Sequence, residues 1–588
     1  MSFGDNENFI SNNESLPVIN LVFDHYDSDD SSSVTDSVST ATYSLHFDEL
    51  CSIESFNQSE FTNSSICSDF SSDSEDEIDE DPINVLDYII IGAGVSGLTL
   101  LQQLQNFDSK LSIKILEATD RVGGRVYTNP HILKKKSIVN GEETEENIYL
   151  NVGAAWLHGT IDNPLTHSPT HPLTHSLTHS LTHSLTHSGT IDNPLMRYVN
   201  KGSDLIHVCD TNPWLYAHEV AFDVMMKGEV ISDKSRSKLL YDKWISMLEY
   251  IQHRQYDRHV SIYDAVKDSI EQMEDANDRM MMKVFLQFFE TWSGASSCNL
   301  PISSAIGYDT FKDSNDIAVS AVGTNFLLHG DYPGSHELFG NTQTIISNIL
   351  DTIKSPDSHI ELNQPVSKVL HSKKFVTVVT KDKRRYLCRK LIVTVPIKPL
   401  LNINFQPPLP TEKVSAMSRI SYSTYKKVQL QFSKPFWSAD VPFLVLSNAN
   451  SNKYNISIGD SVLFNNYYNL KKVYVLEAIV TGSNGDALFK VQDDIVIDII
   501  LNVIKSHYHE QVTELVYHYV SRWEEGEYSQ GSYSYHNVTT TDEDVEVINK
   551  NIKNKIYFAG EHTDPTLYGS LNAAYNSAFR VFKELADK

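Results

Sequence analysis

The residues with the clearest chemical potential are three glycines, Gly92, Gly94 and Gly97, in the segment DYIIIGAGVSGLTLLQQL. The apolar run Tyr88–Ile91 predicts a buried strand before them, and a helix is predicted from about Val95. In this context Gly92 allows a tight turn, Gly94 lets backbone approach a pyrophosphate, and Gly97 lets helix and strand pack closely. The free N–H groups and positive dipole end of the helix then face the phosphates. The segment predicts a dinucleotide-binding turn.

A carboxylate follows these glycines at a distance typical of dinucleotide-binding folds. A second strand is predicted over Ser112–Leu116 and ends in Glu117, 20 residues beyond Gly97. A carboxylate at this position binds ribose hydroxyls, and an acid argues against a cofactor with a 2′-phosphate. The alternative is a glycine turn that holds no ligand.

A glycine doublet between two arginines comes next, in ATDRVGGRVYT. Gly123 and Gly124 lie between Arg121 and Arg125. This arrangement is not part of nicotinamide dehydrogenases and resembles the doublet that follows the dinucleotide unit in many FAD oxidoreductases. Because arginine forks match phosphate geometry, both arginines are expected as charged partners for the pyrophosphate or the flavin edge. The alternative is two surface arginines on a turn.

The C-terminal segment carries a second group of candidate cofactor residues. KIYFAGEHT (Lys555–Thr563) predicts a buried strand followed by Gly560 and Glu561, and a helix with an apolar side is predicted near Asn572. The N-terminus of this helix is expected to face the flavin N1–C2=O edge, where negative charge gathers on reduction. A cofactor domain is thus assembled from both ends of the chain, with a substrate domain between them.

Together these segments resemble the flavin-containing amine oxidases, and most closely the polyamine and spermine oxidases. The resemblance covers about Asn84 to the C-terminus, apart from a histidine-rich insertion. Several blocks follow the family's order and spacing: GAAWLHG (Gly153–Gly159), VTVPIKPL (Val393–Leu400), INFQPPLP (Ile403–Pro410), KVQLQFSKPFW (Lys427–Trp437), SRWEEGEYSQGSYSY (Ser521–Tyr535) and FAGEHT (Phe558–Thr563).

The resemblance implies roles around a non-covalently bound FAD. Lys427 matches the family lysine that hydrogen-bonds flavin N5 through a water. Trp523 matches the tryptophan beside the isoalloxazine, Glu561 the acid near the ribityl chain, and Val366 a residue whose backbone holds the adenine side. On residue type alone, Lys427 would be a solvated edge charge and Trp523 a core residue. The residues implied for FAD are Gly92, Ala93, Gly94, Val95, Ser96, Gly97, Glu117, Arg121, Gly123, Gly124, Arg125, Val366, Trp523, Gly560, Glu561 and Leu571.

The catalytic set implied by the resemblance adds three residues to Lys427. His158 resembles the histidine that contacts the polyamine nitrogens, and Tyr533 one wall of an aromatic slot. Tyr568 is the candidate for the second wall, because Ser570 occupies the family's usual tyrosine position. Amine oxidation moves a hydride equivalent from the α-carbon to flavin N5, so the nitrogen must first be neutral, and a desolvated slot lowers an amine's pKa. O2 then takes the electrons to give H2O2.

Two alanines depart from the family pattern. The helix usually starts with His-Gly-Ala, whereas this sequence has Asn572, Ala573 and Ala574, and a later glycine is Ala578. The substitutions are expected to crowd the backbone near the flavin, so a catalytically impaired flavoprotein that binds partners is one alternative function. Another is a histone-lysine demethylase, a relative with an added helical N-terminal domain and a long coiled-coil insertion. The sequence contains no long heptad run.

The expected fold is an α/β FAD-binding domain, Rossmann-like and of the glutathione-reductase type, with an α+β substrate domain built on a mixed sheet. A disordered acidic tail precedes them. The predicted segments are 1–84 for the tail, 85–158, 320–396 and 522–588 for the FAD-binding domain, 189–319 and 397–521 for the substrate domain, and 159–188 for the insertion.

The predicted tail has an unusual composition. Residues 1–84 contain 20 acidic residues, 19 serines and no Lys or Arg. Such a segment cannot bury enough apolar surface to fold and is expected to act as a solvated spacer. Acidic residues follow serines in Ser71–Pro82, which suits phosphorylation by acid-directed kinases.

A histidine-rich repeat interrupts the chain. Six tetrads, mostly LTHS, occupy Leu165–Ser188, and the heptapeptide GTIDNPL stands on both sides of them. One interpretation is a metal-binding tract, since His at i, i+4 lines one helix face. The other is a repeat expansion, because removing residues 159–188 restores WLHGTIDNPLMRYV without a seam.

Composition limits the remaining functions. The formal charge is −28, which argues against nucleic-acid binding, but the tail carries −20 and residues 85–588 only −8. No apolar run reaches the length of a membrane span, and five cysteines are too few for a disulfide scaffold. We therefore expect a cytoplasmic enzyme whose partners are a small polyamine and O2, with no nucleic acid and no membrane.

Overall fold

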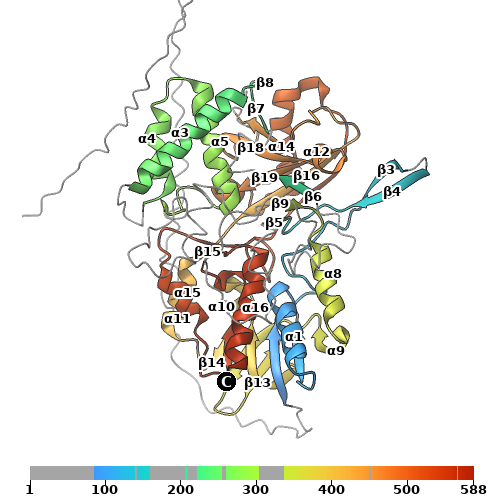
Figure 1. Cartoon of the computed structure of the whole chain (residues 1–588), viewed down its shortest axis with the longest axis vertical. Helices are drawn as coiled ribbons and strands as arrows, with labels where there is room; N and C mark the ends of the chain where they lie inside the picture. The colour runs from blue at the N-terminus through green and yellow to red at the C-terminus, as the bar shows by residue number, and fades with distance from the viewer. Residues whose placement is uncertain are drawn as a thin grey trace, which may run out of the picture.

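The computed structural model describes residues 85–139, 142–158, 206–209, 222–232, 234–253, 260–302, 337–448, 452–565 and 567–587. The predicted disordered tail and the histidine-rich repeat lie outside these residues. The described chain forms two lobes, one below and one above in Figure 1.

The lower lobe is built on the larger sheet. Among the described residues this sheet has eight strands in the order β10-β2-β1-β13-β12-β11-β14, with β22 also paired to β13. Strands β10, β2, β1, β13 and β22 run parallel, whereas β11, β12 and β13 are antiparallel. The strands are β1 (Leu86–Ile91), β2 (Ile113–Leu116), β10 (Ile360–Glu361), β11 (Val366–His371), β12 (Val376–Thr380), β13 (Arg385–Val393), β14 (Asn404–Gln406) and β22 (Ile556–Phe558).

Helices cover both faces of this sheet. Ile90 packs in a core with α1 (Val95–Phe107), α8 (Gln343–Thr352) and α16 (Leu571–Ala586), whereas Ile89 packs in a second core on the opposite face. Because both faces are buried, the second half of β1, Ile89–Ile91, is apolar without alternation. The second core includes residues of α10 (Ile397–Leu401), α11 (Thr411–Arg419) and α15 (Asp542–Asn549), and α9 (Pro356–His359) leads into β10.

The predicted strand and helix around the glycines are confirmed as β1 and α1. Strand β2 begins one residue later than predicted, and α16 begins at Leu571 beside the predicted Asn572. The sheet draws strands from the predicted segments 85–158, 320–396 and 522–588. Strand β14 joins it too, beyond the boundary predicted at residue 396, because the short helix α10 returns the chain to the edge of β11.

The upper lobe is built on a mixed sheet, as predicted for the second domain. In the described part of the chain its order is β20-β16-β19-β18-β17-β7-β8, with β17 and β7 parallel and the other pairs antiparallel. Its strands are β7 (Phe222–Met226), β8 (Glu229–Val230), β16 (Tyr425–Phe432), β17 (Phe443–Ser447), β18 (Ser461–Asn466), β19 (Val475–Thr481) and β20 (Leu515–Val520). The helices of this lobe are α3 (Lys234–His253), α4 (Ile262–Glu271), α5 (Ala276–Ser293), α12 (Tyr467–Lys471), α13 (Gly482–Asp486) and α14 (Asp493–Tyr508).

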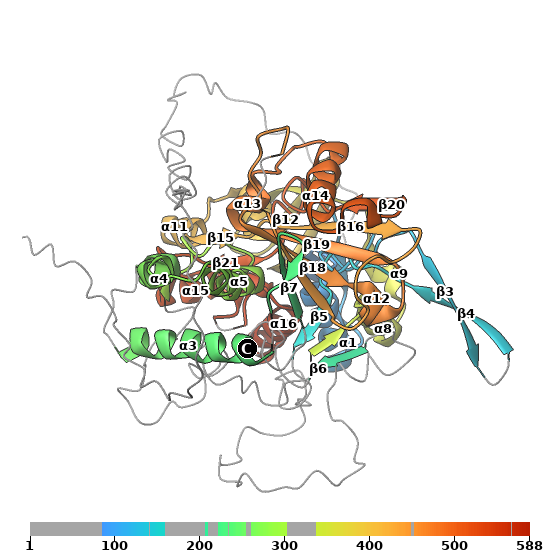
Figure 2. The same ribbon diagram turned by 90° about the horizontal axis from the view of Figure 1, so that it is seen from above.

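Short strand pairs lie between the lobes. They are β5 (Trp156–His158) and β6 (Ile206–Cys209) on either side of β9 (Glu337–Phe339), and β15 (Ile420–Tyr422) with β21 (Ser534–His536). The hairpin of β3 (Leu133–Val139) and β4 (Glu142–Ile148) projects from the body in both ribbon views (Figures 1 and 2).

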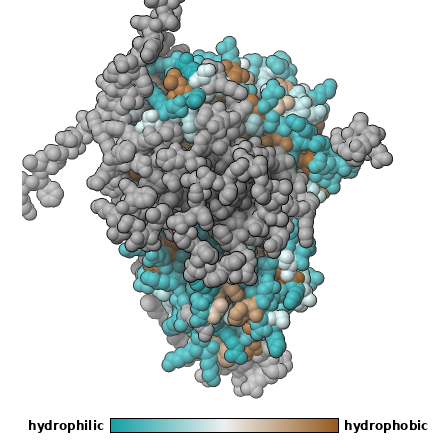
Figure 3. Space-filling view, in the orientation of Figure 1, coloured by the Kyte–Doolittle hydropathy of each residue, from teal (hydrophilic) through white to brown (hydrophobic). Residues whose placement is uncertain are grey.

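One face of the molecule can be followed in Figure 3. On the face drawn in Figure 3, teal residues dominate both lobes and the brown patches are small and separated. None of the helices in the described ranges is both long and apolar enough to cross a membrane. In those ranges, no group of three or more His, Cys, Asp or Glu side chains is placed to hold a metal ion.

Candidate active site

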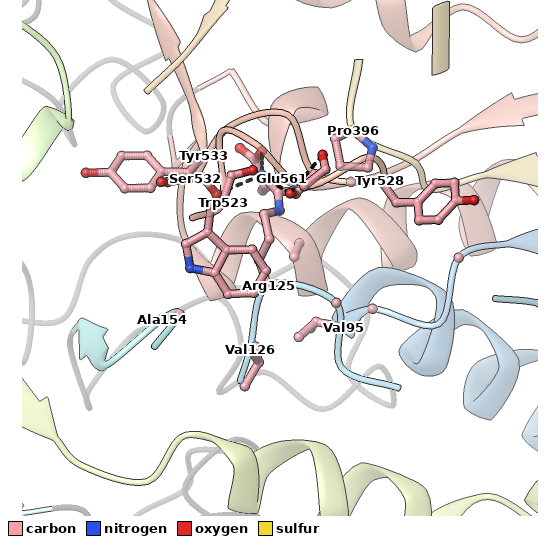
Figure 4. Close-up of a pocket in the computed structure, with 18 of the residues that line it drawn as sticks. Val95, Arg125, Val126, Ala154, Pro396, Trp523, Tyr528, Ser532, Tyr533 and Glu561 are labelled. Carbon is pink, nitrogen blue, oxygen red and sulfur yellow. Dashed lines mark hydrogen bonds and ion pairs between the residues drawn. The ribbon is translucent and has the colours of Figure 1, made fainter. Parts of the chain in front are cut away.

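A cavity of about 780 Å³ is lined by residues of both lobes. Its volume falls within the range of small-molecule and cofactor sites. Tyr528 and Tyr533 lie at opposite ends of the site drawn in Figure 4, with Arg125 and Trp523 between them. The site is therefore elongated, with the glycine turn of the lower lobe along one part and aromatic side chains of the upper lobe along another.

The glycine turn has the shape that a phosphate group requires. Gly94 is the N-cap of α1, no side chain caps the helix there, and a Cβ at this position would meet nothing within 4 Å. Gly94 also lines the cavity, so its backbone and the uncapped helix N-terminus are open to a ligand. A Cβ at Gly97 would instead overlap the carbonyl oxygen of Gly92, which itself has a φ of +101°. The two outer glycines thus shape the turn, and the middle one keeps it accessible.

Glu117 stands at the carboxyl end of β2, beside this turn. Its Oε2 accepts a hydrogen bond from the Ala93 N–H at 2.8 Å, and its Oε1 accepts from the N–H and Oγ1 of Thr119 at 2.9 and 2.7 Å. A carboxylate has about four acceptor sites, so sites remain for ribose hydroxyls. Glu117 lines the cavity, whereas Ala93 is fully buried and acts by holding the carboxylate.

The two arginines of the glycine doublet have different surroundings. Arg121 donates to the carbonyls of Val122 and Gly124 at 3.2 and 2.8 Å and lies 4.2 Å from the centre of the Tyr127 ring. These contacts hold the doublet in its turn. Arg125 instead reaches across the site to the C-terminal segment (Figure 4). Both arginines line the cavity.

Arg125, which is partly buried, forms an ion pair with the buried Glu561, with 2.8 Å between Nη1 and Oε1. Ser534 Oγ donates to Glu561 Oε2 at 2.5 Å, and the Gly569 N–H donates to the same oxygen at 2.8 Å. Desolvation opposes ionisation of Glu561, yet the Arg125 charge and these donors hold its pKa below the usual value. The pair joins the doublet after β2 to the segment after β22, which are far apart in the sequence.

Lys427 is a buried cation at the wall of the cavity. Its Nζ donates to the carbonyls of Gly153 at 2.9 Å and Asn151 at 3.3 Å, and only 5% of the residue is exposed. Burial lowers the pKa of the Lys427 ammonium, and the charge of Glu477 opposes that shift. The sequence alone allowed a solvated edge charge, but the residue lies in the interior of β16 and lines the cavity.

Trp523 packs close to the same loop. Its Nε1 donates to the Val152 carbonyl at 3.0 Å, and a Cβ at Gly153 would lie 3.2 Å from Cζ2 of its ring and overlap the Arg125 carbonyl oxygen. Gly153 therefore lets the indole and the doublet approach each other. Trp523 and Lys427 line one cavity, although 96 positions separate them in the sequence.

Aromatic residues form the upper-lobe part of the cavity. The rings of Tyr425 and Tyr533 have centroids 5.8 Å apart, and the Tyr533 hydroxyl donates to the Trp292 carbonyl at 3.2 Å. Burial raises the pKa of both phenols, so both stay neutral. Trp156 lines the same region. This wall is apolar and uncharged.

Tyr568 lines the cavity with a ring that stacks on His536. The centroids are 3.8 Å apart and the planes differ by 22°. Burial lowers the pKa of His536 to about 4, so this imidazole is neutral near pH 7. The stack fixes the orientation of Tyr568.

The predicted site residues divide into three groups. Most of them line the one cavity, and Ala93 and Gly97 lie behind its wall. His158 ends β5 and pairs with Glu337 of β9, next to the cavity residue Trp156; its side chain lies outside the described atoms. The predicted residues that line the cavity are Gly92, Gly94, Val95, Ser96, Glu117, Arg121, Gly123, Gly124, Arg125, Val366, Lys427, Trp523, Tyr533, Gly560, Glu561, Tyr568 and Leu571.

Sequence reasoning missed Tyr425 and Trp292 as cavity residues, and it included Trp156 only as part of the GAAWLHG block. Tyr425 had a usable signal, because it stands two residues before Lys427 and a strand places i and i+2 on one face. Trp292 had none, since it lies at the end of α5 and reaches the site only through tertiary packing.

These features fit the FAD that the sequence predicts. The accessible Gly94 and uncapped α1 suit a pyrophosphate, and Glu117 suits a ribose. The buried alanines do not close the site, because Ser570 caps α16 through the Ala573 N–H and Ala578 packs in the core against α1. Cys298 and Cys388, the free cysteines with described surroundings, are not among the lining residues, consistent with a non-covalent cofactor.

Comparison with known proteins gives three results. The family described as flavin containing amine oxidoreductase matches residues 95–584. The chain is 25% identical to mouse lysine-specific histone demethylase 1B over 506 residues, which are 85% of this chain and 52% of that protein. It is 24% identical to rice polyamine oxidase 4 over 508 residues, which are 84% of this chain and 88% of that protein.

A solved structure shares the fold. Wild-type putrescine oxidase bound to putrescine aligns with a TM-score of 0.57 and 17% identity, over 86% of this chain and 99% of that one. The chain spans about half the length of the demethylases that it matches. At these identities the comparisons establish the family and the fold, and they leave the substrate open.

Proposed function

The chain belongs to the flavin-containing amine oxidoreductases, and on that premise we propose that it is an oxidase of polyamines. Its cofactor is FAD, bound without a covalent link. The observation that carries the proposal is one cavity in which the glycine turn is continuous with a neutral aromatic wall and a buried lysine. A relative named polyamine oxidase, matched over 88% of its length, supports the same substrate class.

The aromatic wall prepares the substrate. When bound, FAD accepts the hydride equivalent from the amine α-carbon and passes the electrons to O2, which yields H2O2. Tyr425, Tyr533 and Tyr568 surround the amine with uncharged surface, so burial favours its neutral, oxidisable form. Their ring faces also attract the cationic form during entry.

Lys427 is placed to handle a proton next to the reacting atoms. Its Nζ is fixed by the carbonyls of Asn151 and Gly153, and burial lowers its pKa towards the working range. Loss of the hydride equivalent from the α-carbon and of a proton from the nitrogen converts the amine to an imine, and water hydrolyses the imine to an aminoaldehyde and a shorter amine. In this proposal spermine, spermidine or their N-acetyl forms are the substrates and the enzyme is cytoplasmic.

A second candidate is the oxidation of methylated lysine in a histone tail. Two lysine-specific histone demethylases, from mouse and human, match this chain at 25% and 23% identity. Both reactions oxidise an amine α-carbon, so the cavity chemistry is compatible with either. The match covers 52% and 53% of these relatives, which is why we place the polyamine reaction first.

A direct assay separates the candidates. The purified protein should show a flavin absorption spectrum and should produce H2O2 with spermine, spermidine or N-acetyl polyamines, measured with a peroxidase-coupled dye. A dimethyl-lysine histone peptide is the competing substrate, and K427M is the control for turnover at this site. Peroxide from the peptide alone would favour the demethylase. A flavin-loaded protein that gives no peroxide with any amine would favour an impaired flavoprotein.

A further inference from the structure

The carboxylate of Glu477 is buried in the upper sheet, on the strand next to that of Lys427. Glu477 of β19 stands directly opposite Gln429 of β16, and both residues are fully buried. Gln429 Nε2 donates to Glu477 Oε2 at 2.7 Å, and Asn465 Nδ2 donates to Oε1 at 2.9 Å. The Tyr467 hydroxyl donates to Oε2 at 3.4 Å. Neutral donors from neighbouring strands thus satisfy this carboxylate.

Burial of such a group is costly unless a charge compensates for it. A carboxylate moved out of water loses favourable solvation, and hydrogen bonds from neutral donors recover only part of that free energy. Lys427 is the buried cation next to it, because Lys427 faces Ile479 and Glu477 is therefore its diagonal neighbour across the strands. The two opposite charges compensate for each other through the sheet.

A hydrogen-bonded relay joins the two groups. Gln429 Nε2 donates to the Asn151 carbonyl at 3.0 Å as well as to Glu477, and the same carbonyl accepts from Lys427 Nζ at 3.3 Å. Asn129 Nδ2 donates to Gln429 Oε1 at 3.0 Å, which fixes the direction of the amide. The carboxylate, the amide and the carbonyl therefore form one connected path to the ammonium.

We propose that Glu477 is a positioning residue for Lys427, which acts through Gln429 and the Asn151 carbonyl to hold the ammonium at the cavity wall and to supply its countercharge. The assignment rests on the proposed amine oxidation for its catalytic meaning. It does not depend on which amine is oxidised.

The other groups around Lys427 leave Glu477 as its countercharge. From the loop after β4 the Lys427 ammonium contacts carbonyl oxygens, and after β20 the Ser521 hydroxyl accepts from the Lys427 backbone N–H. Arg522 lines the same cavity and pairs with Asp493 and Glu525. On its own strand the Tyr425 phenol is neutral. Across the cavity, Arg125 and Glu561 compensate for each other in their own ion pair.

The test is a pH titration of the visible absorption spectrum of the oxidised, FAD-loaded protein without substrate. A spectral transition that is present in wild type and absent in K427M reports the lysine. E477Q keeps the size of the side chain and removes the charge, so the transition should move about 1 to 2 pH units lower, as expected for a unit charge about 7–8 Å away at an effective dielectric constant of about 20. The midpoint of the pH dependence of amine turnover that is assigned to Lys427 should also move to lower pH.

A matched control lies on the opposite face of the same strand. Lys426 forms a buried ion pair with Glu524, so E524Q removes an equivalent countercharge that does not contact Lys427. E524Q should lower stability and leave the spectral midpoint within about 0.3 units of wild type, well below the shift of one unit or more expected for E477Q. If E477Q retains no FAD, the double variant E477L/Q429L removes the carboxylate together with the amide that links it to the Asn151 carbonyl. It should give the same shift.

Two results would overturn the assignment. One is an unchanged midpoint in E477Q or in the double variant with FAD bound, and the other is an equal shift in E524Q. The proposed function fails separately, by absence of peroxide with every amine from the wild-type protein. The spectral titration needs no turnover, so it tests Glu477 in either case.

Discussion

Gly94 and Gly97 lie three residues apart in the same turn, yet a methyl group added at each should have opposite consequences. At Gly97 a Cβ would overlap the Gly92 carbonyl oxygen and lie 3.2 Å from its carbonyl carbon. At Gly94 a Cβ would meet nothing within 4 Å, and φ is −78°, which alanine adopts freely. We predict that G97A damages the fold, whereas G94A spares the fold and weakens the binding of FAD.

The magnitudes follow from these contacts. In G97A the backbone of the turn must move, and overpacking of this kind costs about 1–3 kcal/mol, offset by about 1 kcal/mol of helix propensity. In G94A the smaller conformational entropy of the unfolded chain stabilises the protein, whereas alanine is a poorer N-cap than glycine and destabilises it. Because these effects nearly cancel, the free energy of unfolding should stay within about 1 kcal/mol of wild type. The new methyl group projects into the cavity beside the α1 N-terminus, where the pyrophosphate is expected. It should weaken FAD binding at least tenfold, or about 1.4 kcal/mol.

Two measurements separate the variants. Thermal unfolding followed by circular dichroism should show a lower Tm for G97A, by a few degrees, and little change for G94A. Titration with FAD, followed by quenching of flavin fluorescence, should show the larger affinity loss in G94A. A wild-type Kd for G94A would refute the assignment of this glycine to the phosphates. A wild-type Tm for G97A would refute the steric argument.

Further predictions concern the buried charges. K427M should slow flavin reduction or reoxidation by about 10²-fold, typical of a lost acid–base group, and unchanged stopped-flow rates would remove its assigned role. E561Q removes the charge that pairs with the partly buried Arg125, while the Ser532 carbonyl still accepts from that arginine, so the free energy of unfolding in urea should fall by about 1–3 kcal/mol. Since folding lowers the Glu561 pKa, the stability that this group contributes is present above about pH 4.5 and is lost as the pH falls below that value. An equal loss of stability at acid pH in E561Q would contradict this. Burial lowers the pKa of His536 and His562 from 6.5 to about 4. The free energy of unfolding should therefore also decrease as the pH falls from 6.5 to about 4, and an H536A/H562A variant should show a weaker dependence of stability on pH in this range.

The local part of the site was predictable because its signal is contiguous. The strand, the glycine turn and the helix from Val95 follow each other within a few residues, and hydrophobic period and glycine spacing specify such a unit directly. The strand before Gly560 was predictable for the same reason.

The composition of the cavity wall was only partly predictable. Tyr533 and Lys427 were identified by resemblance, but the contact of Tyr533 with Tyr425 depends on how two distant strands are placed. Trp292 reaches the wall from the end of α5. No local pattern encodes such a meeting, because it results from packing between the lobes.

The sequence by itself determined the family, the dinucleotide turn and a core set of the residues that line the cavity, because these depend on local spacing and on motif order. Only the tertiary structure decided how charges meet: Arg125 with Glu561, and Lys427 with Glu477 through Gln429. The physical reason is strand register, since Gln429 lies opposite Glu477 only in the pairing of β16 with β19. A slip of one residue would turn these side chains to the other face of the sheet, away from each other and from the cavity.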